Sequence, residues 1–107
     1  MPWTIQVSED AIGDVEWFGR KLGRALLQTA IERLGSNPLA ETRHMKTLRP
    51  NPVAERELRV QCDYRVLFDV NRDNQIVKVL VIGEKQGNQL FVRGQEFTRH
   101  HETDSAE

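Results

Sequence analysis

An alternation of apolar and polar residues runs through "LRVQCDYRVLFDV", residues 58–70, and constrains the fold more than any other feature of the chain. Its even-numbered positions are all apolar or aromatic, whereas its odd-numbered positions are mostly polar and include Arg59, Asp63 and Arg65. Successive side chains of a strand point to opposite faces of a sheet. The segment therefore predicts β structure with one buried face and an exposed face that carries two arginines.

A second segment, "QIVKVLVIG" at residues 75–83, is almost continuously aliphatic, and only Lys78 interrupts it. Such a run is typical of a strand that is buried on both faces, so we expect it to be central in the sheet. The sequence "NRDN" at residues 71–74 is rich in turn-forming side chains. It predicts a hairpin between the alternating segment and the aliphatic strand.

Residues 55–70 are too long for one ordinary strand, and the polar residues 61–63 offer the only interruption. A tight turn centred on Cys62 would place Arg59 and Arg65 opposite each other on one face. Like charges in that position destabilise a sheet. Two explanations remain open: an anion binds between the arginines, or a neighbouring Asp or Glu supplies the counter-charge.

The N-terminal part of the chain predicts one strand and two helices. "WTIQV" at residues 3–7 alternates as a strand does, and Ser8 offers a helix N-cap. Apolar residues then follow helical spacing over residues 11–34, with glycines in the middle. We expect a helical hairpin whose tight connection is "RKLG", residues 20–23, and which stops at Gly35.

The remaining segments predict loops and short strands. Residues 39–55 lack a clear period and contain two prolines, which exclude a central strand there, although a short strand fits near residues 45–48. Gly87 and Gly94 mark turns near the end. The expected fold is α+β: an N-terminal strand, a helical hairpin and then an antiparallel sheet of three to four strands.

Composition indicates an ordinary globular domain. The chain has 107 residues, of which 29% are charged and 38% hydrophobic, and this size suits one domain over residues 1–100. Residues 101–107 hold three acidic side chains and neither Lys nor Arg, so we expect a disordered acidic tail. The preceding residues carry 15 basic and 13 acidic side chains, too small an excess to indicate nucleic-acid binding by itself.

Several classes of site are not expected. The longest aliphatic run, residues 79–82, is far shorter than the roughly 20 residues that span a membrane, and no secretory signal is visible. The single Cys62 excludes an internal disulfide and fits the cytoplasm. "HHE" at residues 100–102 is a poor metal site because adjacent histidines near a chain end rarely form a closed one. We expect no metal and no cofactor, and Gly83 and Gly87 serve turns, since no phosphate-loop motif follows them.

The order of the motifs resembles the RelE/ParE family of toxins from bacterial type II toxin-antitoxin pairs. The resemblance rests on an N-terminal strand, a helical hairpin ending in "SNP", then "KTL", "ELRV", "DYRVLFDV", a polar turn and "IVKVLVIG" followed by a basic residue. It covers about residues 3–97. It implies a small α+β fold in which an antiparallel sheet packs against the helical hairpin and presents a basic face.

The resemblance also implies an activity and partners. RelE-like members cleave messenger RNA in the ribosomal A site without a metal, by attack of the 2′-hydroxyl on the adjacent phosphate, whereas ParE-like members poison DNA gyrase. Family members are neutralised by a cognate antitoxin protein. The first expectation is therefore a ribosome-dependent endoribonuclease. The alternative is a non-catalytic binding protein, either a gyrase-directed toxin or a degenerate toxin that binds only its antitoxin.

Carried over residue by residue, the resemblance assigns catalytic roles to Arg65, Arg59 and Lys85. Arginine suits such a site because its planar fork matches phosphate oxygens in pairs. The chain departs from RelE at Glu57, where RelE has a basic residue, and at Phe91, which takes the place of a C-terminal tyrosine. A phenylalanine can stack on a base but cannot exchange a proton.

Further residues are candidates for contacts with RNA. They are Arg43, His44, Lys46, Arg49 and Phe91. His44 could also supply acid or base chemistry near neutral pH, although a loop histidine without a role is the commoner case. Trp17 and Phe18 fit helix packing, with one of them left exposed for a partner as the alternative.

Overall fold

The computed structural model describes residues 3–97. The proposed acidic tail and the "HHE" segment lie outside this range. The elements, in chain order, are β1 (Thr4–Val7), α1 (Glu9–Phe18), α2 (Arg20–Ser36), β2 (Met45–Thr47), β3 (Arg56–Val60), β4 (Tyr64–Asn71), β5 (Ile76–Gln86), β6 (Gln89–Val92) and β7 (Gln95–Phe97). No helix among the described residues is long and apolar enough to cross a membrane.

The strands form one sheet in the order β2-β3-β4-β5-β6-β7, in which neighbours are antiparallel, and β1 joins it parallel to β5. The α+β fold is confirmed. The expected number of strands was too low, because the sheet has seven. β2 confirms the short strand expected near residues 45–48, whereas β6 and β7 have only four and three residues and hold too few alternating positions to stand out in the sequence.

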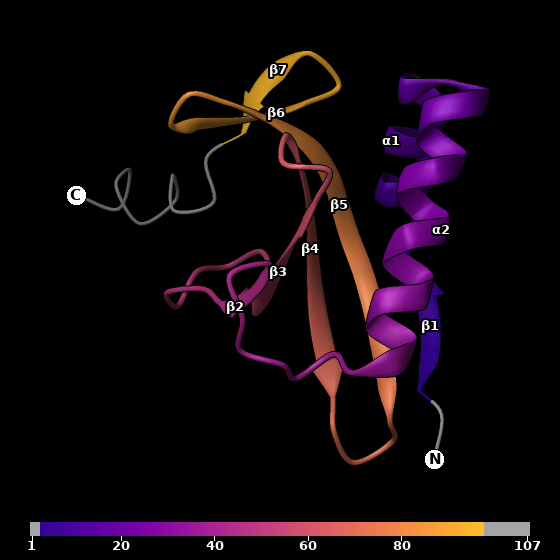
Figure 1. Ribbon diagram of the computed structural model, residues 1–107, viewed down its shortest axis with the longest axis vertical. Coiled ribbons are helices and arrows are strands. Elements are labelled where there is room, and N and C mark those ends of the chain that lie inside the picture. The colour runs from indigo at the N-terminus through magenta and orange to yellow at the C-terminus, as the bar shows by residue number, and fades with distance from the viewer. Residues whose placement is uncertain (1–2, 98–107) are drawn as a thin grey trace.

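Strand β5 is the centre of the sheet, as its two-sided hydrophobicity predicted (Figure 1). One edge of β5 pairs with β4 from Ile76 to Glu84. Two strands from opposite ends of the chain share its other edge: β1 pairs with the first part, up to Val79, and β6 pairs with the last part, from Glu84. Residues 80–83 are paired with neither β1 nor β6.

The start of helix α1 supplies hydrogen bonds along this interval. The Ser8 hydroxyl donates to the Leu80 carbonyl at 3.0 Å, and the Asp14 carboxylate accepts from the Ile82 amide at 2.9 Å. Ser8 also accepts from the Ala11 amide at 3.1 Å, which confirms the predicted N-cap. Buried backbone groups need such partners, so α1 takes the place of a strand at this edge.

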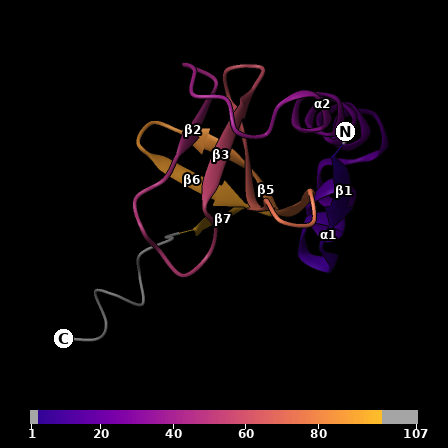
Figure 2. The ribbon, with the colours of Figure 1, turned by 90° about the horizontal axis from the view of Figure 1, so that it is seen from below.

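Both helices lie on one face of the sheet, which we call the helix face (Figure 2). The main core lies there, and its buried members are Ala11, Leu26, Ala30, Leu34, Met45, Leu58, Val60, Val66, Phe68, Val70, Val77, Val79 and Ile82. The opposite face, called the far face, carries a smaller apolar cluster. Its buried members are Ala54, Leu67, Val81 and Leu90, with Leu48, Val53, Leu80, Val92 and Phe97 packed against them.

The connection between the helices differs from the predicted one. Helix α1 ends at Phe18 and α2 begins at Arg20, so Gly19 alone reverses the chain, and residues 20–23 form the first turn of α2. Gly19 has φ = 99°, a conformation that glycine adopts without the steric cost other residues meet, and its amide donates to the Val15 and Glu16 carbonyls. A one-residue link of this kind leaves no stretch of turn-forming sequence to recognise.

Gly23 allows the two helices to approach closely, and this gives a stability prediction. A Cβ atom at position 23 would lie 2.1 Å from the Val15 carbonyl oxygen. We expect Gly23→Ala to lower the free energy of unfolding by about 1–3 kcal/mol in urea denaturation, because the helices must separate. Gly35→Ala is the matched control, since a Cβ at position 35 would meet nothing within 4 Å. Equal stabilities of the two variants would contradict close packing at Gly23.

Candidate functional site

The β3–β4 hairpin places Arg59 and Arg65 opposite each other, as predicted. Val60 pairs with Tyr64, so the turn occupies residues 61–63 and is centred on Cys62. Gln61 and Cys62 have φ values of 50° and 66°, which reverse the chain tightly. The side chains of directly opposed residues lie on the same face of a sheet.

The arginine pair belongs to a longer row across the sheet. On the β3 side, the Arg59 amide donates to the His44 carbonyl at 2.6 Å, and on the β5 side Arg65 pairs with Gly83. Lys85 follows two residues later on β5 and pairs with Leu90, a member of the far-face cluster. We call His44, Arg59, Arg65 and Lys85 the basic row. Strand alternation places Arg59, Arg65 and Lys85 on the far face, and His44 stands in the turn before β2, next to Arg59.

Arg65 is only 5% exposed, so the expectation that it projects from an exposed face was wrong. It lies on β4, inside the sheet, and its far-face neighbours are partly covered by the smaller cluster. Its Nη1 donates to the Cys62 carbonyl at 2.7 Å and to the Tyr64 carbonyl at 3.0 Å. The guanidinium therefore folds back over the hairpin turn, while Arg59 remains exposed.

Electrostatics distinguish Arg65 from the other arginines. Burial lowers the pKa of Arg65, and the charge of Arg59 acts in the same direction, whereas Glu57 and Asp63 oppose the shift. An arginine nevertheless stays protonated in proteins. The site thus contains a permanent positive charge that is largely withdrawn from water.

Glu57 lies within the same face. It is 8% exposed, pairs with Lys46 on β2 and with Leu67 on β4, and its carboxylate is 3.9 Å from the Lys46 ammonium. Because its charge also raises the pKa of Arg65, Glu57 supplies part of the counter-charge that the opposed arginines need. The position and charge of Glu57 thus favour the counter-charge explanation, and an anion between the arginines stays a prediction.

The candidate RNA contacts fall into two groups. Arg43, His44, Lys46 and Arg49 are exposed and lie on β2 or in the segments that flank it; His44 belongs to the basic row, and the other three are close to it in the chain. Phe91 pairs with Glu84 and Glu96 and alternates with Leu90, so it lies on the opposite face of β6. The sheet does not bring Phe91 to the basic row.

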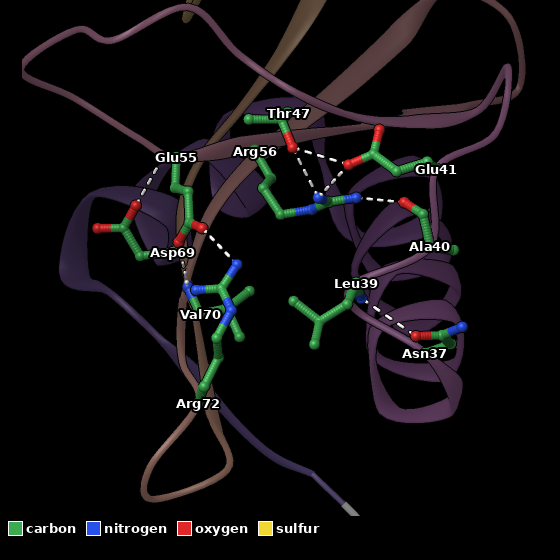
Figure 3. Close-up of polar contacts among 10 residues, drawn as sticks. All are labelled: Asn37, Leu39, Ala40, Glu41, Thr47, Glu55, Arg56, Asp69, Val70 and Arg72. Carbon is green, nitrogen blue, oxygen red and sulfur yellow. Dashed lines mark hydrogen bonds and ion pairs between the residues drawn. The ribbon is translucent and has the colours of Figure 1, made fainter.

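Arg56, to which no sequence motif assigned a role, anchors the segment before β2 (Figure 3). Arg56 is 2% exposed; its Nη1 donates to the Glu41 carboxylate at 2.7 Å and to the Thr47 hydroxyl at 2.9 Å, and its Nη2 donates to the Ala40 carbonyl. These hydrogen bonds hold the pKa of Glu41 below its usual range. A signal was present, because Arg56 occupies the buried phase of the strand that contains Leu58.

A second polar group in Figure 3 fixes the start of β3 to the end of β4. Glu55 binds Arg72 at 2.8 Å, and its amide donates to the Asp69 carboxylate at 2.7 Å. The contacts of Arg56 hold one end of residues 40–55, at Ala40 and Glu41, and the contacts of Glu55 hold the other end. This segment carries the exposed residues Arg43, His44, Lys46 and Arg49. Within residues 3–97, no group of three or more His, Cys, Asp or Glu side chains is arranged to hold a metal ion.

Comparisons with known proteins agree with this architecture. No protein-family model and no curated protein matches the chain. A chain of the toxin-antitoxin complex RelBE2 from Mycobacterium tuberculosis matches 79% of this chain and all of its own length, with a TM-score of 0.67 and 22% identity. A double arginine-to-alanine mutant of the E. coli toxin RelE, in the free state, matches 78% of this chain and 83% of its own length, with a TM-score of 0.57 and 21% identity. The chain therefore has the fold of the RelE toxins.

Proposed function

We propose that this protein is the toxin of a type II toxin-antitoxin pair and that it cleaves messenger RNA on the ribosome. The observation that carries the proposal is the basic row, which gathers side chains from three strands, β3, β4 and β5, and from the turn before β2. The fold it shares with the RelE toxins supports the first part. Fold alone does not determine activity, so the second part depends on the chemistry of the row.

The row suits a reaction in which phosphate oxygens gain negative charge. Attack of the RNA 2′-hydroxyl on the adjacent phosphate forms a 2′,3′-cyclic phosphate and breaks the bond to the 5′-oxygen of the next nucleotide; the hydroxyl gives up its proton and the leaving 5′-oxygen takes one up. The transition state carries extra negative charge on the phosphate oxygens, and positioned cations stabilise it. The exposed Arg59 can present its guanidinium fork to two phosphate oxygens, and Lys85 adds a second charge on β5, two strands away. Arg65 supplies positive charge from beneath the surface of the far face, and its hydrogen bonds to the Cys62 and Tyr64 carbonyls hold the β3–β4 turn. The proposed reaction uses neither a metal nor a cofactor.

The surroundings of the row fit a polyanion and a protein partner. Arg43, His44, Lys46 and Arg49 would contact the RNA backbone beyond the scissile phosphate. Phe91 could contribute only to an RNA segment that reaches the other face of β6. The partner is a cognate antitoxin, by analogy with the RelBE2 complex, and the place of action is the bacterial cytoplasm.

A second candidate is a binding protein without catalysis. Glu57 places a carboxylate among the cations, and Phe91 provides no exchangeable proton and lies away from the row. Both observations favour recognition of DNA gyrase or of the antitoxin alone. A supercoiling assay with purified gyrase tests the first possibility, and copurification with the product of the adjacent gene tests the second.

Arg59→Ala and Lys85→Ala are expected to lower messenger RNA cleavage by tenfold to a hundredfold each. Each removes a charge-assisted contact of about 1.5–3 kcal/mol, and neither is buried as Arg65 is. The assay is translation arrest and cleavage in a ribosome-containing extract, with circular dichroism to monitor folding. Arg24→Ala, an exposed arginine on α2, is the matched control. Wild-type protein that arrests nothing would leave the binding-protein candidate.

A further inference from the structure

Asp14 is a buried carboxylate that none of the steps above uses. It is 0% exposed, on helix α1, and its Oδ2 accepts from the Ile82 amide of β5 at 2.9 Å. Its Oδ1 lies 2.9 Å from Nε of Arg93, an ion pair whose angle falls short of a hydrogen bond. Asp10 is farther from Arg93, at 4.0 Å. One carboxylate thus joins α1, β5 and the loop after β6.

Arg93 holds this position in an unfavourable backbone conformation. Arg93 and Gly94 form the two-residue loop between β6 and β7, with φ values of 51° and 81°. Such loops favour Asn-Gly, because only small or polar side chains tolerate these angles well. A non-glycine residue held there by its surroundings indicates a role for its side chain.

The same loop fits closely against helix α1. A Cβ atom on Gly13 would lie 3.0 Å from Nη1 of Arg93, and a Cβ atom on Gly94 would lie 3.3 Å from the ring of Trp17. Gly13 therefore leaves room for the guanidinium, and Trp17, which is 52% exposed, lies beside the loop. The hairpin of β6 and β7, residues 89–97, is docked on α1 through these contacts.

This docking controls the part of the sheet that carries Lys85. Asp14 holds Ile82, which lies three residues before Lys85, and through Arg93 it holds the end of β6. Between Ile82 and Arg93, Leu90 of β6 pairs with Lys85 of β5. The Lys85 amide also donates to the Asp63 carbonyl of the β3–β4 turn at 2.6 Å. A shift of the hairpin would therefore move Lys85 relative to that turn.

We propose that Asp14 and Arg93 are positioning residues, which dock the hairpin of residues 89–97 on α1 and thereby set the place of Lys85 beside Arg65. The inference rests on the proposed function only for its activity readout, because docking itself can be measured without RNA. Neither residue belongs to the basic row, and the sequence analysis assigned a role to neither.

The charges around Asp14 give the docking a pH dependence. Burial raises the pKa of Asp14, the Ile82 hydrogen bond and the charge of Arg93 oppose the shift, and Asp10 adds to it. Glu96 of β7 lines the same cavity of about 370 Å³, together with Asp10, Asp14 and Arg93. Protonation of Asp14 as the pH falls removes the ion pair with Arg93. The charge of Arg93 favours the ionised form of Asp14, so protonation weakens the contact between the hairpin and α1. Because the pKa of Asp14 is raised on folding, the same protonation does not destabilise the folded domain relative to the unfolded chain.

Two substitutions in the full-length chain separate docking from folding. Arg93→Asn removes the ion pair but creates the Asn-Gly sequence that this turn prefers, so the hairpin stays formed. Asp14→Asn keeps an oxygen for the Ile82 amide but loses the charge. Amide hydrogen exchange, corrected for intrinsic rates, should rise at least tenfold more at Lys85 and along β6 than along α2 in Arg93→Asn, and Arg93→Lys should restore part of the protection. An equal rise along α2 would report a loss of global stability alone and would overturn the proposal.

Activity provides the second readout. Wild-type cleavage should fall as the pH is lowered through the titration of Asp14, whereas Asp14→Asn should cleave weakly and lose this acid limb. Unchanged exchange at Lys85 in Arg93→Asn would overturn the proposal, as would raised exchange with full cleavage. If the wild-type protein cleaves nothing, the proposed function fails, and the exchange at Lys85 alone still decides whether Asp14 and Arg93 position it.

Discussion

Arg65→Ala is expected to abolish cleavage, by at least a hundredfold, and to destabilise the protein at the same time. The side chain is 5% exposed, and its Nη1 bonds to the Cys62 and Tyr64 carbonyls, so its removal leaves acceptors in the β3–β4 turn without their donor. A lost hydrogen bond from a charged group corresponds to about 1.5–3 kcal/mol. Both effects follow from one side chain that supplies charge and supports the turn.

The two effects can be separated by comparing Arg65→Ala with Arg65→Lys. Lysine keeps the charge but lacks the planar fork, so we expect Arg65→Lys to recover part of the stability and little of the activity. Activities in the ribosome-containing extract should be divided by the folded fraction obtained from urea denaturation. Arg59→Ala, which removes the opposite but exposed arginine, should leave stability nearly unchanged. A fully active Arg65→Ala protein would exclude the basic row from the reaction.

Arg93→Asn is expected to destabilise the protein far more than Asp14→Asn, although the two variants break the same ion pair. Removing Arg93 leaves a fully buried carboxylate without its counter-ion, which costs about 3–5 kcal/mol. Removing the charge of Asp14 leaves an arginine that is 45% exposed and can turn to water, so we expect a loss of about 1 kcal/mol or less. Urea denaturation at neutral pH measures both free energies of unfolding.

Lowering the pH should reduce the difference in the free energy of unfolding between Arg93→Asn and Asp14→Asn. In Arg93→Asn the buried carboxylate can take up a proton, and its stability then rises as the pH falls through the raised pKa of Asp14. Asp14→Asn has no such group and should show little of this dependence. Two results would contradict an ionised Asp14 in the native state. One is an equal loss of stability in both variants at neutral pH, and the other is a difference in their free energies of unfolding that does not change with pH.

The central hairpins of the fold could be predicted from sequence because their signals are local. Alternation over residues 58–70 and the aliphatic run at 75–83 each define a strand, and polar turns separate them. The exposure of Arg65 could not be predicted in this way. A period of two tells which residues share a face, but the covering of the far face comes from Leu90 and Val92, which are distant in the sequence.

The roles of Arg56 and Asp14 could not be predicted for a second reason. Arg56 shares a strand face with the buried Leu58, and Asp14 lies one helical turn after the buried Ala11, so both are polar side chains on faces that point into the protein. No sequence pattern indicates which side chains Arg56 and Asp14 contact. Arg93 reaches Asp14 across 79 positions because β6 continues the edge of β5 where β1 ends, and only the topology of the whole sheet reveals this. The roles expected for Phe91 and the other RNA contacts stay predictions.

The shared edge of β5 has a consequence for how the protein is made. Strands β3, β4 and β5 are joined by short turns and can associate as soon as they are synthesised, whereas the edge of β5 is completed by β1 from the beginning of the chain and by β6 near its end. Asp14 cannot form its ion pair until Arg93, 79 positions later in the chain, has been synthesised. A nascent chain thus completes the surroundings of Lys85 only after residues 89–93 have been synthesised, when the hairpins of β3, β4 and β5 can already have formed.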